Sequence, residues 1–408
     1  MSASLFALDP MLTGHLDFGV VAIVLLKVLI TFGLLLVAVL LMIWFERKVH
    51  ADMSNRLGPN RAGPWGILQT LADGTKFFFK EDLIPDRADR TVFVLAPFLS
   101  VVPAFLVFSV IPIGGRFNGE DQGIVHLFGH DTYLQLADPP IGILFVLACS
   151  SIAVYGVMLA GWSSGSKYPL LGAVRASAQM VSYEAALAMS VLAVVLLSGS
   201  LSTHDIVFTQ AGEGFGIFPR WNLIVTGVVP FVIFLLAGTA ELNRPPFDLV
   251  EAEQELVGGF HTEYSSIRFA LFFLAEFMNT VTMSAIIVTL FLGGPAGPVL
   301  FGPVLMWGPI WFLLKLVAFL FMFVWFRATL PRFRYDQLMD LGWKVLIPLS
   351  LGWLLLLAAI NVARDEGWNL GVVVGIGFAV LVAGYVLLTT AMRNAQLRRD
   401  ELEPEGIS

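Results

Sequence analysis

The chain contains 408 residues, of which 57% are hydrophobic and 13% charged, and its mean hydropathy is +0.81. Soluble globular proteins are less apolar than this, so the composition predicts a polytopic membrane protein. The net charge of −7 argues against a nucleic-acid partner. The single cysteine, Cys149, rules out an intramolecular disulfide and argues against an iron–sulfur cluster held by this chain.

Nine apolar stretches are long enough to cross a bilayer core, which takes about 20 residues in a helix. The spans are expected near residues 19–45, 91–113, 140–161, 178–198, 222–240, 269–292, 305–327, 343–362 and 369–391. The first apolar run is too long for a cleavable signal peptide. We therefore expect an all-α membrane domain over residues 1–408, with about nine transmembrane helices.

The distribution of Lys and Arg predicts the orientation. With the N-terminus outside, the inner loops hold 19 of these residues and the outer loops hold three, Arg116, Arg220 and Arg364. Inner loops of membrane proteins are enriched in positive charge. The loops at 46–90 and 241–268 and the C-terminal tail are therefore expected on the cytoplasmic side.

The first inner loop, residues 46–90, is expected to carry a short amphipathic helix that lies in the interface. Gly58-Pro59-Asn60 and Gly63-Pro64 force turns. After them, apolar residues recur at helical spacing, while Asp73, Lys76 and Lys80 form one polar face. The segment is either a solvated surface helix or the rim of a lipid-side entrance for an amphiphile, and in the second case Arg56, Asp73 or Lys76 would guide polar groups.

The fifth and sixth expected spans are joined by an acidic inner loop. Residues 241–264 hold six carboxylates, and the double proline Pro245-Pro246 keeps the preceding chain extended. In a helix that starts near Asp248, Glu251 and Glu255 would share one face and Glu253 would point elsewhere. Crowded carboxylates raise one another's pKa and can hold and pass protons. A solvated acidic loop and a divalent-cation site are the alternatives, although the spacing matches no calcium loop.

Ionisable residues also fall within the spans, where they usually mark ion or proton paths. Glu184 and Glu276 are proton-relay candidates, or else neutral acids that pack through hydrogen bonds. Lys27 lies close enough to a span end to extend to the interface, and Lys315 is deeper and is expected to pair with an acid. His126 and His130 lie at i and i+4 without a third ligand nearby, so we expect no metal site.

Several long motifs resemble a known family. They are WFERKVHADMSNRLGPNRAGPWGILQTLADGTKFFFKED from residue 44, SYE from 182, AELNRPPFDLVEAEQELVGGFHTEYSS from 240 and FFLAEFMN from 272. Together they resemble the H subunit of bacterial proton-pumping NADH–quinone oxidoreductase, respiratory complex I, over roughly residues 20–360.

This resemblance implies a membrane subunit without a redox centre of its own, and so without flavin or iron–sulfur cluster. Ubiquinone or menaquinone would enter a tunnel in this subunit, and a chain of carboxylates would couple quinone reduction to proton translocation. Implied partners are the peripheral-arm iron–sulfur and quinone-site subunits, the antiporter-like membrane subunits and the lipid of the bacterial cell membrane.

Matched residue by residue, the resemblance assigns three groups of side chains. The implied tunnel residues are Glu46, Arg47, Arg56, Asp73 and Lys76. The implied acidic chain consists of Glu184, Glu241, Glu251, Glu253, Glu255 and Glu276. Arg244 would pair with these acids and order the loop.

The chain departs from the family pattern in two places. A ninth span and a tail, residues 369–408, follow the usual eight spans, and Lys27 has no match in the pattern. Two other functions remain open. One is the equivalent subunit of a membrane-bound hydrogenase or a deazaflavin-cofactor dehydrogenase. The other is a proton-coupled secondary transporter, which predicts inverted repeats that we do not find in the sequence.

Overall fold

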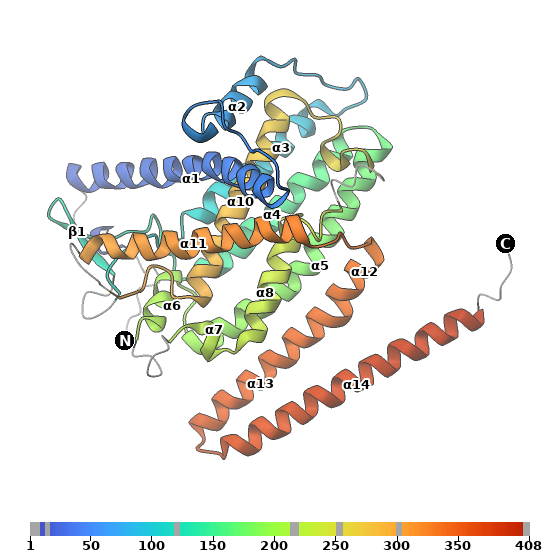
Figure 1. The fold of residues 1–408 in the computed structure, drawn as a ribbon. Coiled ribbons are helices and arrows are strands. Elements are labelled where there is room, and N and C mark those ends of the chain that lie inside the picture. Colours follow the sequence, from blue (N-terminus) through green and yellow to red (C-terminus); the bar gives the residue numbers. More distant parts are fainter. Residues whose placement is uncertain are drawn as a thin grey trace.

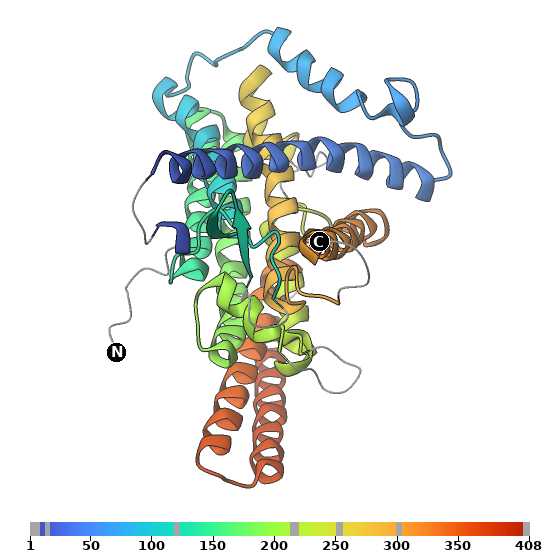
Figure 2. The same cartoon turned by 90° about the vertical axis from the view of Figure 1, so that its left-hand side faces the viewer.

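The computed structural model describes residues 9–12, 17–117, 123–212, 220–249, 256–298 and 304–402. These residues form a helical bundle, from which one pair of helices extends (Figures 1 and 2). The long helices are α1 (Phe18–Met53), α3 (Arg90–Phe108), α4 (Gly142–Ser163), α5 (Lys167–Ser198), α10 (Ser266–Phe291), α11 (Val304–Thr329), α13 (Ile347–Asp365) and α14 (Leu370–Leu402). The shorter elements are η1 (Pro10–Leu12), η2 (Pro64–Gly66), α2 (Gln69–Phe79), α6 (Thr203–Gln210), α7 (Asn222–Val225), α8 (Val228–Glu241), η3 (Gly259–His261), α12 (Tyr335–Asp340) and the π-helical turn η4 (Leu341–Leu346). The predicted all-α polytopic class is confirmed.

Eight helices in the described ranges are long and apolar enough to cross a membrane, and one of them runs without a break from Tyr335 to Asp365. The expected fifth span, 222–240, is interrupted instead. Helix α7 ends at Val225, and Gly227 then takes a φ of +81° before α8 begins. Helix α8 has 14 residues, or about 21 Å at roughly 1.5 Å per residue, which is less than a bilayer core of about 30 Å. It packs chiefly on α5.

Helices α3, α4 and α5 pack closely because small residues lie between them. A Cβ on Gly156 of α4 would come within 2.4 Å of the Ser100 hydroxyl on α3. A Cβ on Gly161 would come within 2.3 Å of the Ala173 Cβ on α5. Lipid tails are as apolar as leucine, so close van der Waals contact takes the place of the hydrophobic effect in holding such helices together.

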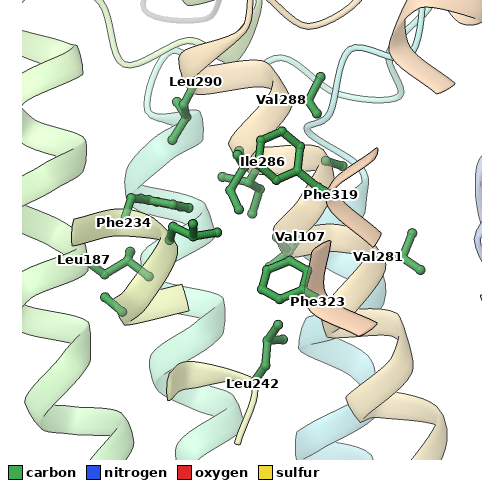
Figure 3. Close-up of a cluster of buried hydrophobic side chains, with 14 of the residues drawn as sticks. Val107, Leu187, Phe234, Leu242, Val281, Ile286, Val288, Leu290, Phe319 and Phe323 are labelled. Carbon is green, nitrogen blue, oxygen red and sulfur yellow. The ribbon is translucent and has the colours of Figure 1, made fainter. Parts of the chain in front are cut away.

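A large apolar core fills the space between α5, α8, α10 and α11 (Figure 3). Phe234 of α8 is 1% exposed, and its ring lies 5.5 Å from that of Phe291 on α10. Phe323 of α11 belongs to the same cluster. This core fixes α10 relative to the rest of the bundle, and α10 carries much of the candidate site.

Helices α13 and α14 form a hairpin that extends from the bundle (Figures 1 and 2). Close packing comes from glycines, since a Cβ on Gly352 would lie 2.4 Å from Leu381 and one on Gly377 would lie 2.3 Å from Leu356. In the apolar stretch of α14 no residue is buried. Its apolar surface suits a lipid environment.

A β-hairpin of β1 (Ile124–Leu127) and β2 (His130–Tyr133) was not predicted. Phe128 and Gly129 both have positive φ, at 50° and 86°, as a tight two-residue hairpin turn requires. The strands place His126 opposite Asp131, and the two side chains form an ion pair. His126 and His130, four residues apart in the sequence, therefore lie on different strands.

Candidate functional site

A groove of about 610 Å³ lies between α1, α2 and α10. Apolar side chains line most of it, and the polar exceptions include Arg47 of α1 and Asp73 and Lys76 of α2. Arg47 and Asp73 form an ion pair across the groove. The groove thus combines an apolar trough with a small charged patch, which suits an amphiphile with a polar head and an apolar tail.

The first loop holds α2 against the bundle through polar contacts at both of its ends. The Trp44 indole N–H donates to the Trp65 carbonyl oxygen at 3.0 Å. The Ser266 hydroxyl at the start of α10 lies 2.9 Å from the carbonyl oxygens of both Phe77 and Lys80. The predicted helix in this loop is confirmed, and these contacts set the width of the groove.

Glu46 lies in a buried charge cluster between α1, α11 and the segment after α8. Its side chain is 7% exposed and pairs with Arg244 at 2.6 Å and also with Arg327 of α11. Arg244 is 3% exposed, its Nε lies 3.0 Å from a Glu276 oxygen, and its guanidinium lies 4.4 Å from the centre of the Phe277 ring. The Nε contact is electrostatic and not a well-aligned hydrogen bond. Two carboxylates from α1 and α10 thus meet at one buried arginine.

Two small cavities of about 80 and 70 Å³ lie beside this cluster. The first is lined by Glu241, Glu276 and Asn279, among others. The second is also lined by Glu241 and Asn279, and in addition by Ser150. Both cavities share Glu241, so this residue lies between the void that Glu276 lines and the void that Ser150 of α4 lines. We name the first of them the acid cavity.

Glu184 of α5 is connected to the second cavity through two serines of α4. The Ser151 hydroxyl donates a short hydrogen bond to Glu184. The Ser150 hydroxyl lies 3.5 Å from the same Glu184 oxygen, and Ser150 lines the second cavity together with Glu241. Ser150 therefore lies between the two carboxyl groups, and hydroxyl groups can both accept and donate a proton.

His261 lines the acid cavity at the end of η3. Its ring lies 5.3 Å from the ring of Phe269 and 4.9 Å from that of Phe260. Burial lowers the pKa of His261 to about 4, so the imidazole is neutral near pH 7. A neutral imidazole has one donor and one acceptor nitrogen and brings no extra charge to the cavity.

The structure places the predicted tunnel residues in three different environments. Arg47, Asp73 and Lys76 line the groove, whereas Glu46 lies in the arginine cluster. Arg56 is exposed beyond the end of α1. Among the predicted acids, Glu184, Glu241 and Glu276 come together around the cavities, while Glu251, Glu253 and Glu255 lie outside the described residues.

Sequence reasoning gave no role to Arg327, Ser150 or Ser151. An arginine near the end of an apolar span was a signal for Arg327, but small hydroxyl residues in apolar helices are common and give little warning.

The pairing predicted for Lys315 is wrong. Its ammonium donates to the carbonyl oxygens of Leu292, Gly294 and Ala296, at 2.7, 2.9 and 2.9 Å.

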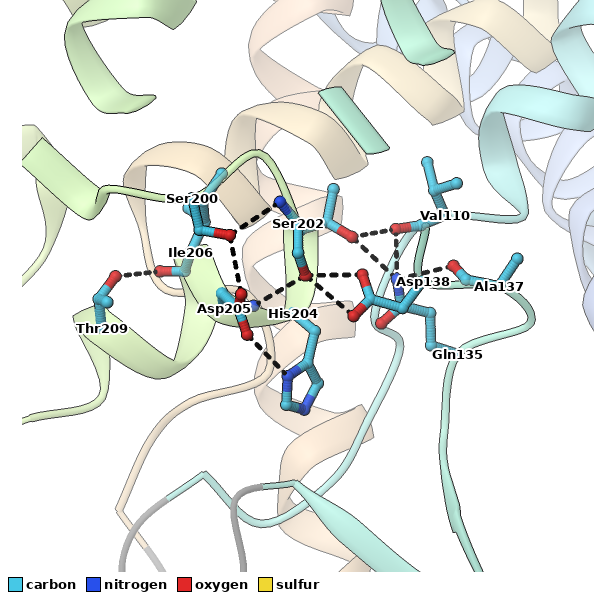
Figure 4. Close-up of polar contacts among 11 residues, drawn as sticks. Val110, Gln135, Ala137, Asp138, Ser200, Ser202, His204, Asp205, Ile206 and Thr209 are labelled. Carbon is cyan, nitrogen blue, oxygen red and sulfur yellow. Dashed lines mark hydrogen bonds and ion pairs between the residues drawn. The ribbon is translucent and has the colours of Figure 1, made fainter. Parts of the chain in front are cut away.

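A second polar cluster joins the loop before α4 to α6 (Figure 4). The Ser202 hydroxyl donates to both oxygens of Asp138, at 2.8 and 2.9 Å, and caps α6. Burial raises the pKa of Asp138, while the Ser202 hydrogen bond and the charge of His204 oppose the rise. The neighbouring His204, whose Nδ1 lies 3.9 Å from an Asp205 oxygen, lowers the pKa of Asp205. Lys27 forms an ion pair with Asp9, and the Thr132 hydroxyl accepts a hydrogen bond from Lys27 and donates one to Asp9. These contacts fix the loops at this end of the bundle.

Comparison with known proteins gives consistent results. The family model described as NADH dehydrogenase matches residues 26–358. The H subunit of NADH-quinone oxidoreductase from Frankia alni is 52% identical over 384 residues, which cover 92% of this chain and 82% of the relative. The protein of the same name from Frankia casuarinae is 52% identical and that of Streptomyces avermitilis 49% identical, over 88% and 90% of this chain and 79% and 78% of theirs.

Proposed function

Since this chain belongs to the NADH dehydrogenase family and is a membrane subunit of an NADH–quinone oxidoreductase, we propose that it guides quinone and couples quinone reduction to proton movement. The observation that carries this proposal is the adjacency of an amphiphile-sized groove and a set of buried and half-buried carboxyl groups. Both features lie along α10, which contributes side chains to each.

The groove between α1, α2 and α10 is the proposed lipid-side entrance for the quinone. A quinone has a long apolar tail, which suits the apolar trough, and a polar head, which suits the Arg47–Asp73 pair and Lys76. Arg56 and Glu46 are proposed to act further along the path, Glu46 by holding Arg244 in place. Ubiquinone and menaquinone both have this chemistry.

Glu276, Glu241 and Glu184 are the proposed proton relay. A proton on Glu276 can cross the acid cavity to Glu241, and Ser150 can then take that proton and release its own to Glu184. Each exchange moves one proton and leaves the donor deprotonated, so that it can accept the next proton. On the family resemblance we extend the relay to Glu251, Glu253 and Glu255, and we propose that Arg244 orders their loop.

The proposed partners are the peripheral-arm subunits that reduce the quinone and the antiporter-like membrane subunits that move protons. The redox centres belong to the peripheral arm in this proposal. The proposed location is the bacterial cell membrane, with the N-terminus outside and the acidic loop and C-terminus in the cytoplasm, as the charge distribution favours. The names of the relatives favour the NADH–quinone enzyme over the hydrogenase, deazaflavin and transporter alternatives.

The relay is tested with Glu276→Gln and Glu241→Gln in the assembled enzyme in sealed membrane vesicles. Glutamine keeps the shape of the side chain but cannot carry a proton. We expect NADH-driven proton uptake to fall about tenfold or more, since positioned proton carriers contribute roughly 10²–10⁴-fold. The exposed Glu366, in the turn between α13 and α14, supplies the matched control Glu366→Gln. Wild-type proton uptake in correctly assembled Glu276→Gln and Glu241→Gln enzymes would remove the relay.

A further inference from the structure

The groove and the acid cavity share one wall. Phe269 and Phe273 of α10 line both voids. The two residues are one helical turn apart, so their side chains lie on the same face of α10. Their rings are nearly parallel, at 18°, with centres 6.3 Å apart. A pair of aromatic rings therefore stands between the space suited to an amphiphile and the space that holds Glu241 and Glu276.

The wall is supported from both sides. On the groove side, the Phe77 ring of α2 lies 5.8 Å from that of Phe269. On the cavity side, the His261 ring lies 5.3 Å from Phe269. At the far end, Phe277 meets Phe273 edge to face at 4.7 Å. Contacts between aromatic rings of this kind contribute about 0.5–1.5 kcal/mol each beyond the burial of area.

The two spaces need to be separated for physical reasons. The groove is mainly apolar and about 610 Å³, and the acid cavity is about 80 Å³ and contains two carboxyl groups. An apolar chain that entered the cavity would displace water and strip the carboxyl groups of solvation, which is costly for any charged form. Proton transfer needs water or polar groups in contact, so an apolar occupant would also interrupt it.

We propose that Phe269 and Phe273 form a partition that keeps the occupant of the groove out of the acid cavity, and that His261 packs against Phe269 from the cavity side. This inference rests on the proposed function, because it gives the groove and the cavity separate roles. His261 is a positioning residue here, and Phe269 and Phe273 determine what can pass.

The test measures how readily an apolar reagent in the groove reaches and labels Glu276. Dicyclohexylcarbodiimide is apolar and reacts with protonated carboxyl groups in apolar surroundings. The acid proton moves to a carbodiimide nitrogen, the carboxyl oxygen bonds to the central carbon, and rearrangement gives an N-acylurea that retains the whole reagent. Peptide mass spectrometry on the assembled enzyme then measures the fraction of Glu276 labelled over time.

We expect Phe273→Ala to raise the labelling rate of Glu276 about fivefold or more, because removal of this half-buried ring opens the wall and would join the two voids. The matched control is Phe272→Ala. Of the described residues that line these voids, Phe272 lines the acid cavity and not the groove. Phe272→Ala should enlarge the cavity without joining it to the groove, so labelling should stay near the wild-type rate.

The milder variant Phe273→Leu serves if Phe273→Ala does not assemble, and it should give a smaller rise in the same direction. Wild-type labelling in an assembled Phe273 variant would overturn the partition, as would an equal rise in Phe272→Ala. Labelling does not depend on whether Glu276 relays protons. Failure of the partition is thus distinguishable from failure of the relay, which is measured by proton uptake in Glu276→Gln.

Discussion

Arg244 offers the most direct test of how the site is held together. It is 3% exposed and contacts Glu46 at 2.6 Å and Glu276 at 3.0 Å. The change Arg244→Met keeps a long side chain and removes the charge. Removal of one partner from a buried ion pair costs about 3–5 kcal/mol. The Glu276 side chain is 31% exposed and Arg327 remains beside Glu46, so we expect the lower end, about 3 kcal/mol.

A loss of about 3 kcal/mol corresponds to a factor of more than 100 in an equilibrium constant. Domains of 150–250 residues lose roughly 2–4 °C of Tm for each kcal/mol. A longer chain in a large assembly loses less, and we expect a fall of about 5 °C. The assay is the midpoint at which NADH–quinone activity is lost on heating at a fixed rate, because unfolding of large complexes is usually irreversible.

Two comparisons sharpen the assay. Arg364→Met makes the same chemical change at an exposed position near the end of α13 and should shift the midpoint by about 1 °C or less. Combining Arg244→Met with Glu276→Gln also removes a carboxylate that Arg244 contacts, so the two losses should fall short of additivity by about 0.5–3 kcal/mol. An assembled Arg244→Met enzyme with the wild-type midpoint would refute the argument that this arginine holds the cluster.

Three further changes test other parts of the molecule. Asp73→Ala should raise the apparent KM for quinone about fivefold, since an exposed ion pair is worth up to about 1 kcal/mol. The control is Asp52→Ala on the exposed end of α1. An unchanged KM in Asp73→Ala would remove Asp73 from the quinone path. Deletion of residues 369–408 should leave turnover intact, because the apolar stretch of α14 contributes no buried residue; loss of turnover in an assembled complex would contradict an accessory role. Asp138→Asn should raise the thermal midpoint near pH 8, and the gain should shrink as pH falls. The folded pKa of Asp138 is raised above its ordinary value of 3.8, so stability from its protonated form is present at low pH and lost as pH rises through the raised pKa. If the difference in thermal midpoint between Asp138→Asn and wild type stayed the same at all pH values, the predicted direction of this pH dependence would be contradicted.

The sequence predicted most of the individual elements. Hydropathy is a local property, and the spans follow from runs of apolar residues. The acids Glu184 and Glu276 stood out because a carboxyl group is costly within an apolar span. The helix after Pro64 followed from turn residues and helical spacing in the first loop. The interruption at Gly227 and the hairpin at Phe128-Gly129 were missed, because each depends on the backbone conformation of one or two residues.

The different roles of the predicted site residues could not be read from the sequence. Glu46 was assigned to the tunnel with Arg47, yet the two adjacent side chains point to different places, one into the arginine cluster and the other into the groove. Residues next to each other in a helix are separated by about 100° around its axis. The resemblance transferred both residues to one role, and only the surrounding helices distinguish them.

By itself the sequence determined most of the stretches that are long and apolar enough to cross a membrane, and which family pattern the chain follows, since both depend on residue types at short spacing. The tertiary structure decided which of them meet. Glu46 reaches Arg244 across 198 residues and Arg327 across 281, and the wall of Phe269 and Phe273 separates two voids formed by other helices. Such contacts depend on how helices pack against one another, and close packing of whole helices is not encoded at any single position.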